Sequence, residues 1–148
     1  MDFQKILVAV DDSPSSVAAF NYAVEFAQLV NAQLAVATIF EIDQLNVYEY
    51  LSPDVLRKQK DKTINLAEEY VRKAKEKGLP APEAFVDEGG PAEVIIKQIL
   101  PAYQPDLLIC GSFVRKKHKN LLGEQADYMV RNAICSVFIV KNDPSVKP

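Results

Sequence analysis

The stretch Asp106-Leu-Leu-Ile-Cys-Gly-Ser112 is an apolar run of strand type that ends in a glycine, and a second glycine, Gly123, opens a helical pattern farther on. A strand, a turn and a helix N-terminus in this order bring backbone N–H groups and the positive end of a helix dipole to one point. This is how α/β proteins hold phosphate. Between the two glycines stand Phe113, Val114 and the basic run Arg115-Lys-Lys-His-Lys119, where a phosphate loop typically has small residues. The stretch therefore predicts an α/β fold and a candidate phosphate site.

Strand-like and helical patterns alternate along the rest of the chain. Runs at 5–10, 33–40, 83–87, 107–110 and 136–141 predict strands, and the continuous apolar character of the first is typical of a strand buried on both faces of a parallel sheet. Helices are expected at 14–30, 54–77, from 91 to a break within 101–105, and 122–133, while 41–53 is interpreted as a surface excursion. Ser13 is a suitable N-cap for the first helix, and Pro14 fits its first position. This alternation predicts a doubly wound, five-stranded parallel sheet with helices on both faces.

Right-handed crossovers leave few strand orders, and in the order 3-2-1-4-5 the first and fourth strands are neighbours. A crevice then opens at their carboxyl ends, where the direction of the chain across the sheet reverses. Asp11 and Asp12 follow the first strand, and Gly111 and Ser112 follow the fourth. Ile39, near the end of the second strand, would form a wall of this crevice.

Composition limits the classes of function. The 148 residues are 49% hydrophobic and 25% charged, with a net charge of −3, which fits one globular domain over 1–148 with a flexible tail at 142–148. No apolar run approaches the ~20 residues of a membrane span, and no signal-peptide pattern opens the chain, so we expect a cytoplasmic protein that does not contact membrane. Cys110 and Cys135 lack metal-ligand spacing and are expected to be small buried thiols.

Three segments together resemble one protein family. Ile6-Leu-Val-Ala-Val-Asp-Asp-Ser13, Asp106 to Ser112, and Gly123-Glu-Gln-Ala-Asp-Tyr-Met-Val-Arg-Asn-Ala-Ile-Cys-Ser-Val-Phe-Ile-Val140 are similar to the universal stress proteins. The resemblance covers essentially the whole chain, including Glu88-Gly-Gly-Pro-Ala-Glu93. It implies a 3-2-1-4-5 sheet of the adenine nucleotide alpha hydrolase-like type and a role in the stress response.

The resemblance also implies a homodimer that pairs through the last strand, here Val137, Phe138, Ile139 and Val140. An apolar edge strand is an unpaired template unless something covers it, which favours the same interface. The alternative is an edge protected by the charges near Lys141 and Asp143.

One branch of the family binds ATP through glycine, two residues, glycine, nine residues, then glycine and serine or threonine. Gly111 and Gly123 match the first and third glycines, but Val114 replaces the second, Glu124 replaces the hydroxyl residue, and the intervening stretch is one residue short. Valine disfavours the positive φ that glycine allows, and the carboxylate of Glu124 would repel a γ-phosphate. The resemblance implies a degenerate nucleotide site lined by Ala9, Val10, Asp11, Ile39, Gly111, Ser112, Gly123, Glu124 and Gln125.

Each of these signals also has a structural alternative. Asp11 could cap the first helix rather than contact a ligand, and Glu124 in a first helical turn favours the helix dipole with no ligand bound. The basic run 115–119 could neutralise phosphates, although a solvated surface loop is the simpler interpretation. For catalysis, His118 has no evident partner and Ser112 no evident base, and no metal-ligand cluster appears.

The sequence thus predicts a non-catalytic stress-response protein that acts as a homodimer. Unknown protein partners, or a small ligand such as an AMP-like nucleotide bound at the crevice, would mediate its role. Two alternatives stay open. One is an ATP-binding switch with Mg²⁺ and slow or no hydrolysis, and the other, less favoured, is weak nucleic-acid binding through residues 115–119.

Overall fold

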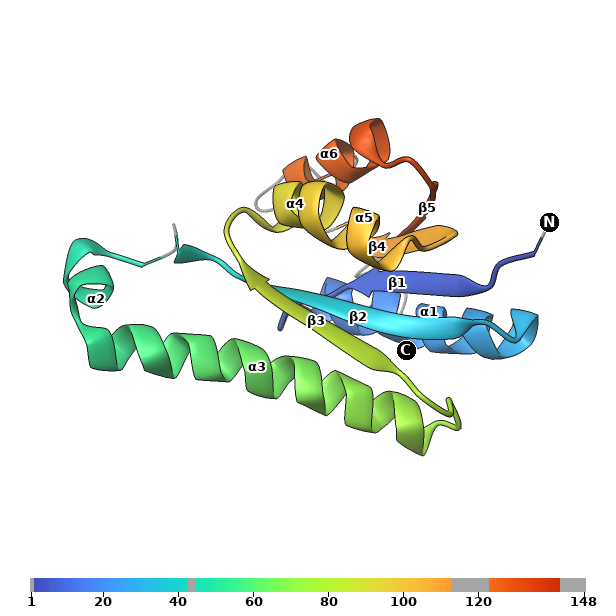
Figure 1. Ribbon diagram of the computed structural model, residues 1–148, viewed down its shortest axis with the longest axis horizontal. Coiled ribbons are helices and arrows are strands. Elements are labelled where there is room, and N and C mark those ends of the chain that lie inside the picture. The colour runs from blue at the N-terminus through green and yellow to red at the C-terminus, as the bar shows by residue number, and fades with distance from the viewer. Residues whose placement is uncertain (1, 43–44, 113–122, 142–148) are drawn as a thin grey trace.

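Five parallel strands form one sheet in the order β3-β2-β1-β4-β5 (Figure 1). The computed structural model describes residues 2–42, 45–112 and 123–141. Val114, the basic run 115–119 and the tail 142–148 lie outside the described residues. The predicted fold class and strand order are confirmed.

The strands and helices alternate as the sequence predicts. They are β1 (Lys5–Ala9), α1 (Pro14–Val30), β2 (Gln33–Phe40), α2 (Val47–Leu51), α3 (Pro53–Glu76), β3 (Glu83–Glu88), α4 (Pro91–Val94), the π-helical turn η2 (Ile95–Ile99), α5 (Leu100–Tyr103), β4 (Leu107–Gly111), α6 (Glu124–Asn132) and β5 (Ser136–Val140). In the register, Val8 lies opposite Val36 of β2 and Ile109 of β4. No helix in the described part of the chain is long and apolar enough to cross a membrane.

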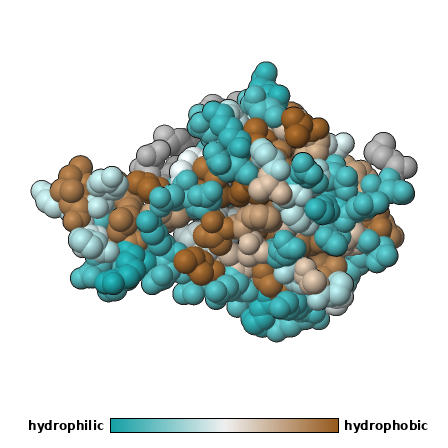
Figure 2. Space-filling view, in the orientation of Figure 1, coloured by the Kyte–Doolittle hydropathy of each residue, from teal (hydrophilic) through white to brown (hydrophobic). Residues whose placement is uncertain are grey.

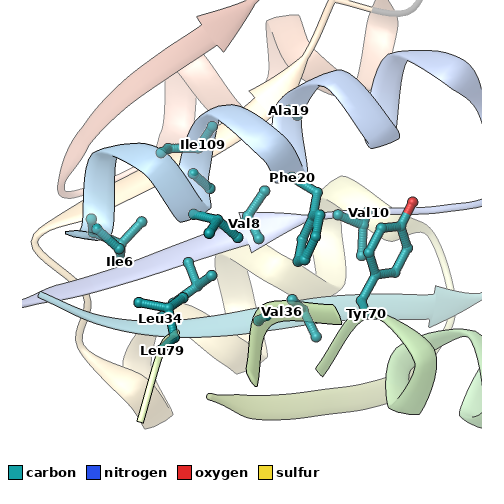
Figure 3. Close-up of a cluster of buried hydrophobic side chains, with 14 of the residues drawn as sticks. Ile6, Val8, Val10, Ala19, Phe20, Leu34, Val36, Tyr70, Leu79 and Ile109 are labelled. Atoms are coloured by element: carbon teal, nitrogen blue, oxygen red, sulfur yellow. The ribbon is translucent and has the colours of Figure 1, made fainter. Parts of the chain in front are cut away.

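Helices cover both faces of the sheet, so the central strands are apolar throughout. On one face Ile6 and Val8 pack with the buried side of α1 and with Tyr70 of α3 (Figure 3). On the other face Leu7 packs with α4, η2, α5 and α6. This explains why apolar and polar residues do not alternate in β1, since its successive side chains enter the two cores in turn.

Helix α1 begins and ends as the sequence indicates. Ser13 is its N-cap and accepts a hydrogen bond from the N–H of Ser16 at 3.2 Å, and Pro14 occupies the first helical position. Asn31 ends the helix in the left-handed region with φ 58°. The start of α1 is thereby fixed beside the carboxyl end of β1.

The helix after β3 continues past Pro101 and ends at Tyr103, within the interval where a break was expected. The turn η2 explains this, because the N–H of Leu100 reaches back five residues to the carbonyl of Ile95. Proline lacks an N–H, and a π-turn shifts the hydrogen-bond register just before it.

The surface excursion between β2 and α3 contains a short helix, α2, that the sequence analysis did not predict. Its N-terminus carries a complete capping box between Asn46 and Glu49. None of its residues is buried, and Val47 and Leu51 are each 69% exposed. Together with the first turns of α3 it forms an arm that projects beyond the sheet, with apolar side chains on its surface (Figures 1 and 2).

Candidate functional site

Asp11, two residues after the end of β1, is tied to the start of α1 by three hydrogen bonds. The Ser16 hydroxyl donates to Asp11 Oδ1 at 2.8 Å, and the N–H of Ser13 donates to the same oxygen at 2.8 Å. In return, the N–H of Asp11 donates to Ser16 Oγ at 2.8 Å. Asp11 therefore holds the turn that leads into α1 through one carboxylate oxygen, whereas the N-cap itself is Ser13, so Asp11 does not have the helix-capping role that the sequence left open.

A fourth hydrogen bond holds the main chain of Asp11 from the other side. The Tyr70 hydroxyl on α3 donates to the Asp11 carbonyl at 2.9 Å. The Tyr70 ring is buried and packs against Phe20, with its oxygen at the edge of the cluster (Figure 3). Burial first, and then the charges of Asp11 and Asp12, raise the pKa of Tyr70 to about 12, so the hydroxyl stays a donor at neutral pH.

Gly111 ends β4 at a close contact between the strand and the first turn of α1. A Cβ at this position would lie 2.1 Å from Ser15 Oγ and 2.8 Å from the Ser15 carbonyl oxygen. The residue after it, Ser112, donates its N–H to the Val140 carbonyl of β5 at 3.1 Å. Gly111 is thus required for the contact between α1 and β4, whether or not a ligand binds nearby.

The predicted adenine wall has an apolar lining from two neighbouring strands. Ala9 and Ile39 are half-buried and pack on the layer that contains α4 and α6. Val10 is buried in the opposite core, and its N–H donates to the Ala37 carbonyl at 2.9 Å. Ala9 and Ile39 therefore face the layer of α4 and α6, whereas the Val10 side chain faces α1 and α3.

At the start of α6, Gly123 is the N-cap and makes no side-chain capping bond. Glu124 is exposed in the first turn, where its negative charge interacts favourably with the helix dipole without any ligand. Gln125 Oε1 accepts a hydrogen bond from the N–H of Ala92 at 2.8 Å. Gln125 thus caps the neighbouring helix α4, a role that the sequence analysis did not anticipate.

The predicted site residues form two groups at the carboxyl edge of the sheet. Asp11, Gly111 and Ser112 lie at the ends of the adjacent strands β1 and β4, while Gly123 to Gln125 lie beside the start of α4. Among the described residues, no hydrogen bond joins the two groups, and no cluster of three His, Cys, Asp or Glu side chains could hold a metal ion. Ser16 and Tyr70 are the residues that sequence reasoning missed. Ser16 stands three residues after a cap, which is a weak signal, and Tyr70 lies 59 residues from Asp11.

The edge strand β5 is half-buried from Val137 to Val140, and its first residue, Ser136, is exposed. Phe138 packs edge-on against Phe26 at 5.2 Å and Phe3 at 6.1 Å between ring centroids. Tyr22 and residues 137–141 line an open groove of about 560 Å³. Phe138 therefore packs against this chain's own core, and this packing by itself explains an apolar residue at this position of β5.

The model of the universal stress protein family matches residues 2–141. The chain belongs to the universal stress protein family. Among curated relatives, a putative universal stress protein of Staphylococcus saprophyticus is 27% identical over 144 residues, which are 97% of this chain and 86% of that protein. One from Staphylococcus aureus strain USA300 is 27% identical over 142 residues, which cover 95% of this chain and 86% of its own. The family resemblance seen in the sequence is confirmed.

Solved universal stress proteins share the fold. UspA from Lactobacillus plantarum superposes with a TM-score of 0.77 at 23% identity, over 95% of this chain and 99% of its own. A universal stress protein solved in complex with cAMP has a TM-score of 0.66 at 24% identity, over 97% of this chain and 100% of its own. At these identities the likeness establishes the architecture, and the ligand is a property of that other protein.

Proposed function

We propose that this universal stress protein is a non-catalytic homodimer that binds a small adenine nucleoside or mononucleotide at the carboxyl ends of β1 and β4. The observation that carries the proposal is Asp11, which is exposed at the point where strand order reverses. Two hydrogen bonds to its carboxylate and two to its main chain fix it there. Ligands of doubly wound sheets bind at this point. The cAMP bound by a structural relative supports a nucleotide as the ligand class.

The start of α6 favours a ligand without a triphosphate. A hydroxyl residue in the first turn would donate a hydrogen bond to a phosphate oxygen, whereas the Glu124 carboxylate repels the negatively charged phosphate. The side chain of Gln125 is used by α4. What remains for phosphate on α6 is the backbone and dipole of a nine-residue helix, and the carboxylate works against both.

Calorimetric titration with adenosine, AMP and ATP–Mg tests this function. We expect adenosine and AMP to bind at submillimolar concentration, and ATP–Mg to bind no more tightly than AMP. ATP–Mg binding at least tenfold tighter than AMP would favour the ATP-switch alternative instead. No heat with any of the three would rule out the nucleotide ligand and leave protein contacts as the mode of action.

The dimer proposal rests on the backbone of β5. The Val140 carbonyl accepts from the N–H of Ser112, just after β4, so the main-chain polar groups of Val140 and Phe138 face β4. Those of the alternate residues Val137 and Ile139 face the open edge of the sheet. This edge is a template for a second copy.

Val137→Pro removes one outward N–H and is expected to shift the mass in light scattering from dimer to monomer. Val137→Ala, which keeps that N–H, is the control and should remain a dimer. A Val137→Pro protein that is folded and still dimeric would place the interface elsewhere.

A further inference from the structure

The loop that carries Asp11 is held by contacts that the start of a helix does not need. Ser13 alone caps α1, accepting the N–H of Ser16. The Ser16 hydroxyl, itself nearly buried, is used for Asp11 instead, so that each residue is both donor and acceptor to the other. Such reciprocal bonds fix the χ angles of an exposed carboxylate that would otherwise sample several rotamers.

Tyr70 adds a constraint from a different layer of the molecule. Its hydroxyl reaches the Asp11 carbonyl from α3, and its ring is wedged against Phe20 with centroids 4.8 Å apart. The backbone of Asp11 is thereby fixed relative to both α1 and α3. A side chain locked by packing and by hydrogen-bonded neighbours is the arrangement that a precise binding site requires.

The same contacts determine what Asp11 can recognise. Oδ1 already accepts from Ser13 and Ser16, which occupies its two lone pairs. Oδ2 has no hydrogen-bond partner in the described part of the chain, and Asp11 is exposed. An ionised carboxylate accepts hydrogen bonds and repels anions, so its open oxygen suits a hydroxyl or an amino group.

We infer that Ser16 and Tyr70 are positioning residues that aim Asp11 at the hydrogen-bond-donating end of the ligand, its ribose hydroxyls or exocyclic amine, rather than at its phosphate. This inference rests on the proposed nucleoside-binding function. It assigns the uncharged part of the ligand to the ends of β1 and β4. It also predicts that a free nucleoside binds without help from phosphate.

The chain offers matched controls for both residues. Ser15, the neighbour of Ser16, has a buried hydroxyl without a hydrogen-bond partner, so Ser15→Ala removes a hydroxyl that does not touch Asp11. Tyr103 on α5 is as buried as Tyr70, and burial likewise raises its pKa to about 12, but it lies in the opposite layer. Tyr103→Phe therefore reproduces the loss of a buried phenol far from the site.

The experiment is a titration of each folded variant with adenosine at 25 °C. Ser16→Ala should raise the dissociation constant about tenfold, as expected for a lost hydrogen bond to a charged group, and Tyr70→Phe should raise it about threefold. Ser16→Thr, which keeps the donor, should stay within about threefold of the wild-type protein, as should Ser15→Ala and Tyr103→Phe. Inorganic phosphate should not displace adenosine. Equal affinities for Ser16→Ala and Ser15→Ala, or displacement by phosphate, would overturn the inference.

Amide hydrogen exchange without ligand separates this inference from the function on which it rests. Loss of the Ser16 hydroxyl should accelerate exchange at the Asp11 amide, which loses its acceptor, and at the Ser13 amide, because its acceptor Asp11 Oδ1 is no longer held by Ser16. Ser15→Ala should change neither. Unchanged exchange in Ser16→Ala shows that the loop is not held as described and overturns the inference. A wild-type protein that ignores adenosine but shows the expected exchange difference overturns the proposed ligand and, with it, the aim assigned to Asp11.

Discussion

Replacing Gly111 with alanine tests the close contact between α1 and the end of β4. The added Cβ would lie 2.1 Å from Ser15 Oγ, which can rotate away, and 2.8 Å from the Ser15 carbonyl oxygen, which belongs to the first turn of α1 and cannot. Added atoms that force a backbone shift cost about 1–3 kcal/mol, and a carbonyl contact this short belongs near the upper end. We expect Gly111→Ala to lower the free energy of unfolding by about 2–3 kcal/mol.

Urea denaturation followed by circular dichroism measures this loss as a fall in the midpoint of roughly 1 M, and thermal unfolding as a fall of about 5–10 °C. The double variant Gly111→Ala with Ser15→Ala removes the nearer clash and should recover about 1 kcal/mol or less, because the carbonyl remains. Gly90→Ala is the matched control. Nothing lies within 4 Å of a Cβ there and φ is −77°, so its stability should change by less than about 0.5 kcal/mol.

A Gly111→Ala protein as stable as the wild type would refute this packing argument. The expected loss also changes how site variants are interpreted. A substitution at Gly111 that abolishes ligand binding would report the displaced start of α1 as much as a lost ligand contact. Ser16→Ala and Tyr70→Phe are better probes of the site, since each removes only a hydroxyl group.

Three further predictions concern other parts of the fold. Burial raises the pKa of Cys110 to about 12, so at pH 8 a thiol reagent should label only Cys135 in the native protein. Both thiols should react after unfolding, and labelling of Cys110 in the native protein would contradict its burial. Gln125→Ala removes the acceptor at the start of α4 and should destabilise the protein by about 1 kcal/mol in urea denaturation, whereas no change would show that water replaces it. The backbone N–H groups of Lys5 and Gln4 lower the pKa of Asp106, so its stabilising effect should be complete above about pH 5 and be lost as the pH falls through the lowered value. Asp106→Asn should flatten that part of the pH–stability curve, and an unchanged curve would contradict the assignment.

The architecture was predictable because each signal was local and repeated. The unbroken apolar run of β1, the cap and proline at Ser13 and Pro14, and the alternation of strands and helices each point to one doubly wound sheet. Helix α2 was missed because its apolar side chains face solvent and give no amphipathic pattern. Its one sequence signal is the capping box that begins at Asn46.

The site was predictable only to the level of its place in the sheet. Strand order brings Asp11 and Gly111 to one edge, and this follows from topology. The partners of Asp11 do not follow from topology. The contact with Tyr70 spans 59 residues and depends on where α3 packs against the sheet. Gln125 was assigned to a ligand because of its place in the family motif, whereas the structure shows that it binds the backbone of α4.

The central claim is that the ends of β1 and β4 bind the uncharged part of a nucleoside through Asp11. Titration of ¹⁵N-labelled protein with adenosine, followed by amide chemical shifts, tests it most directly. The account predicts saturable shifts centred on Asp11, Ser13 and Ser112, strongly reduced in Ser16→Ala. Shifts confined to the groove along β5, or none at millimolar adenosine, would contradict it.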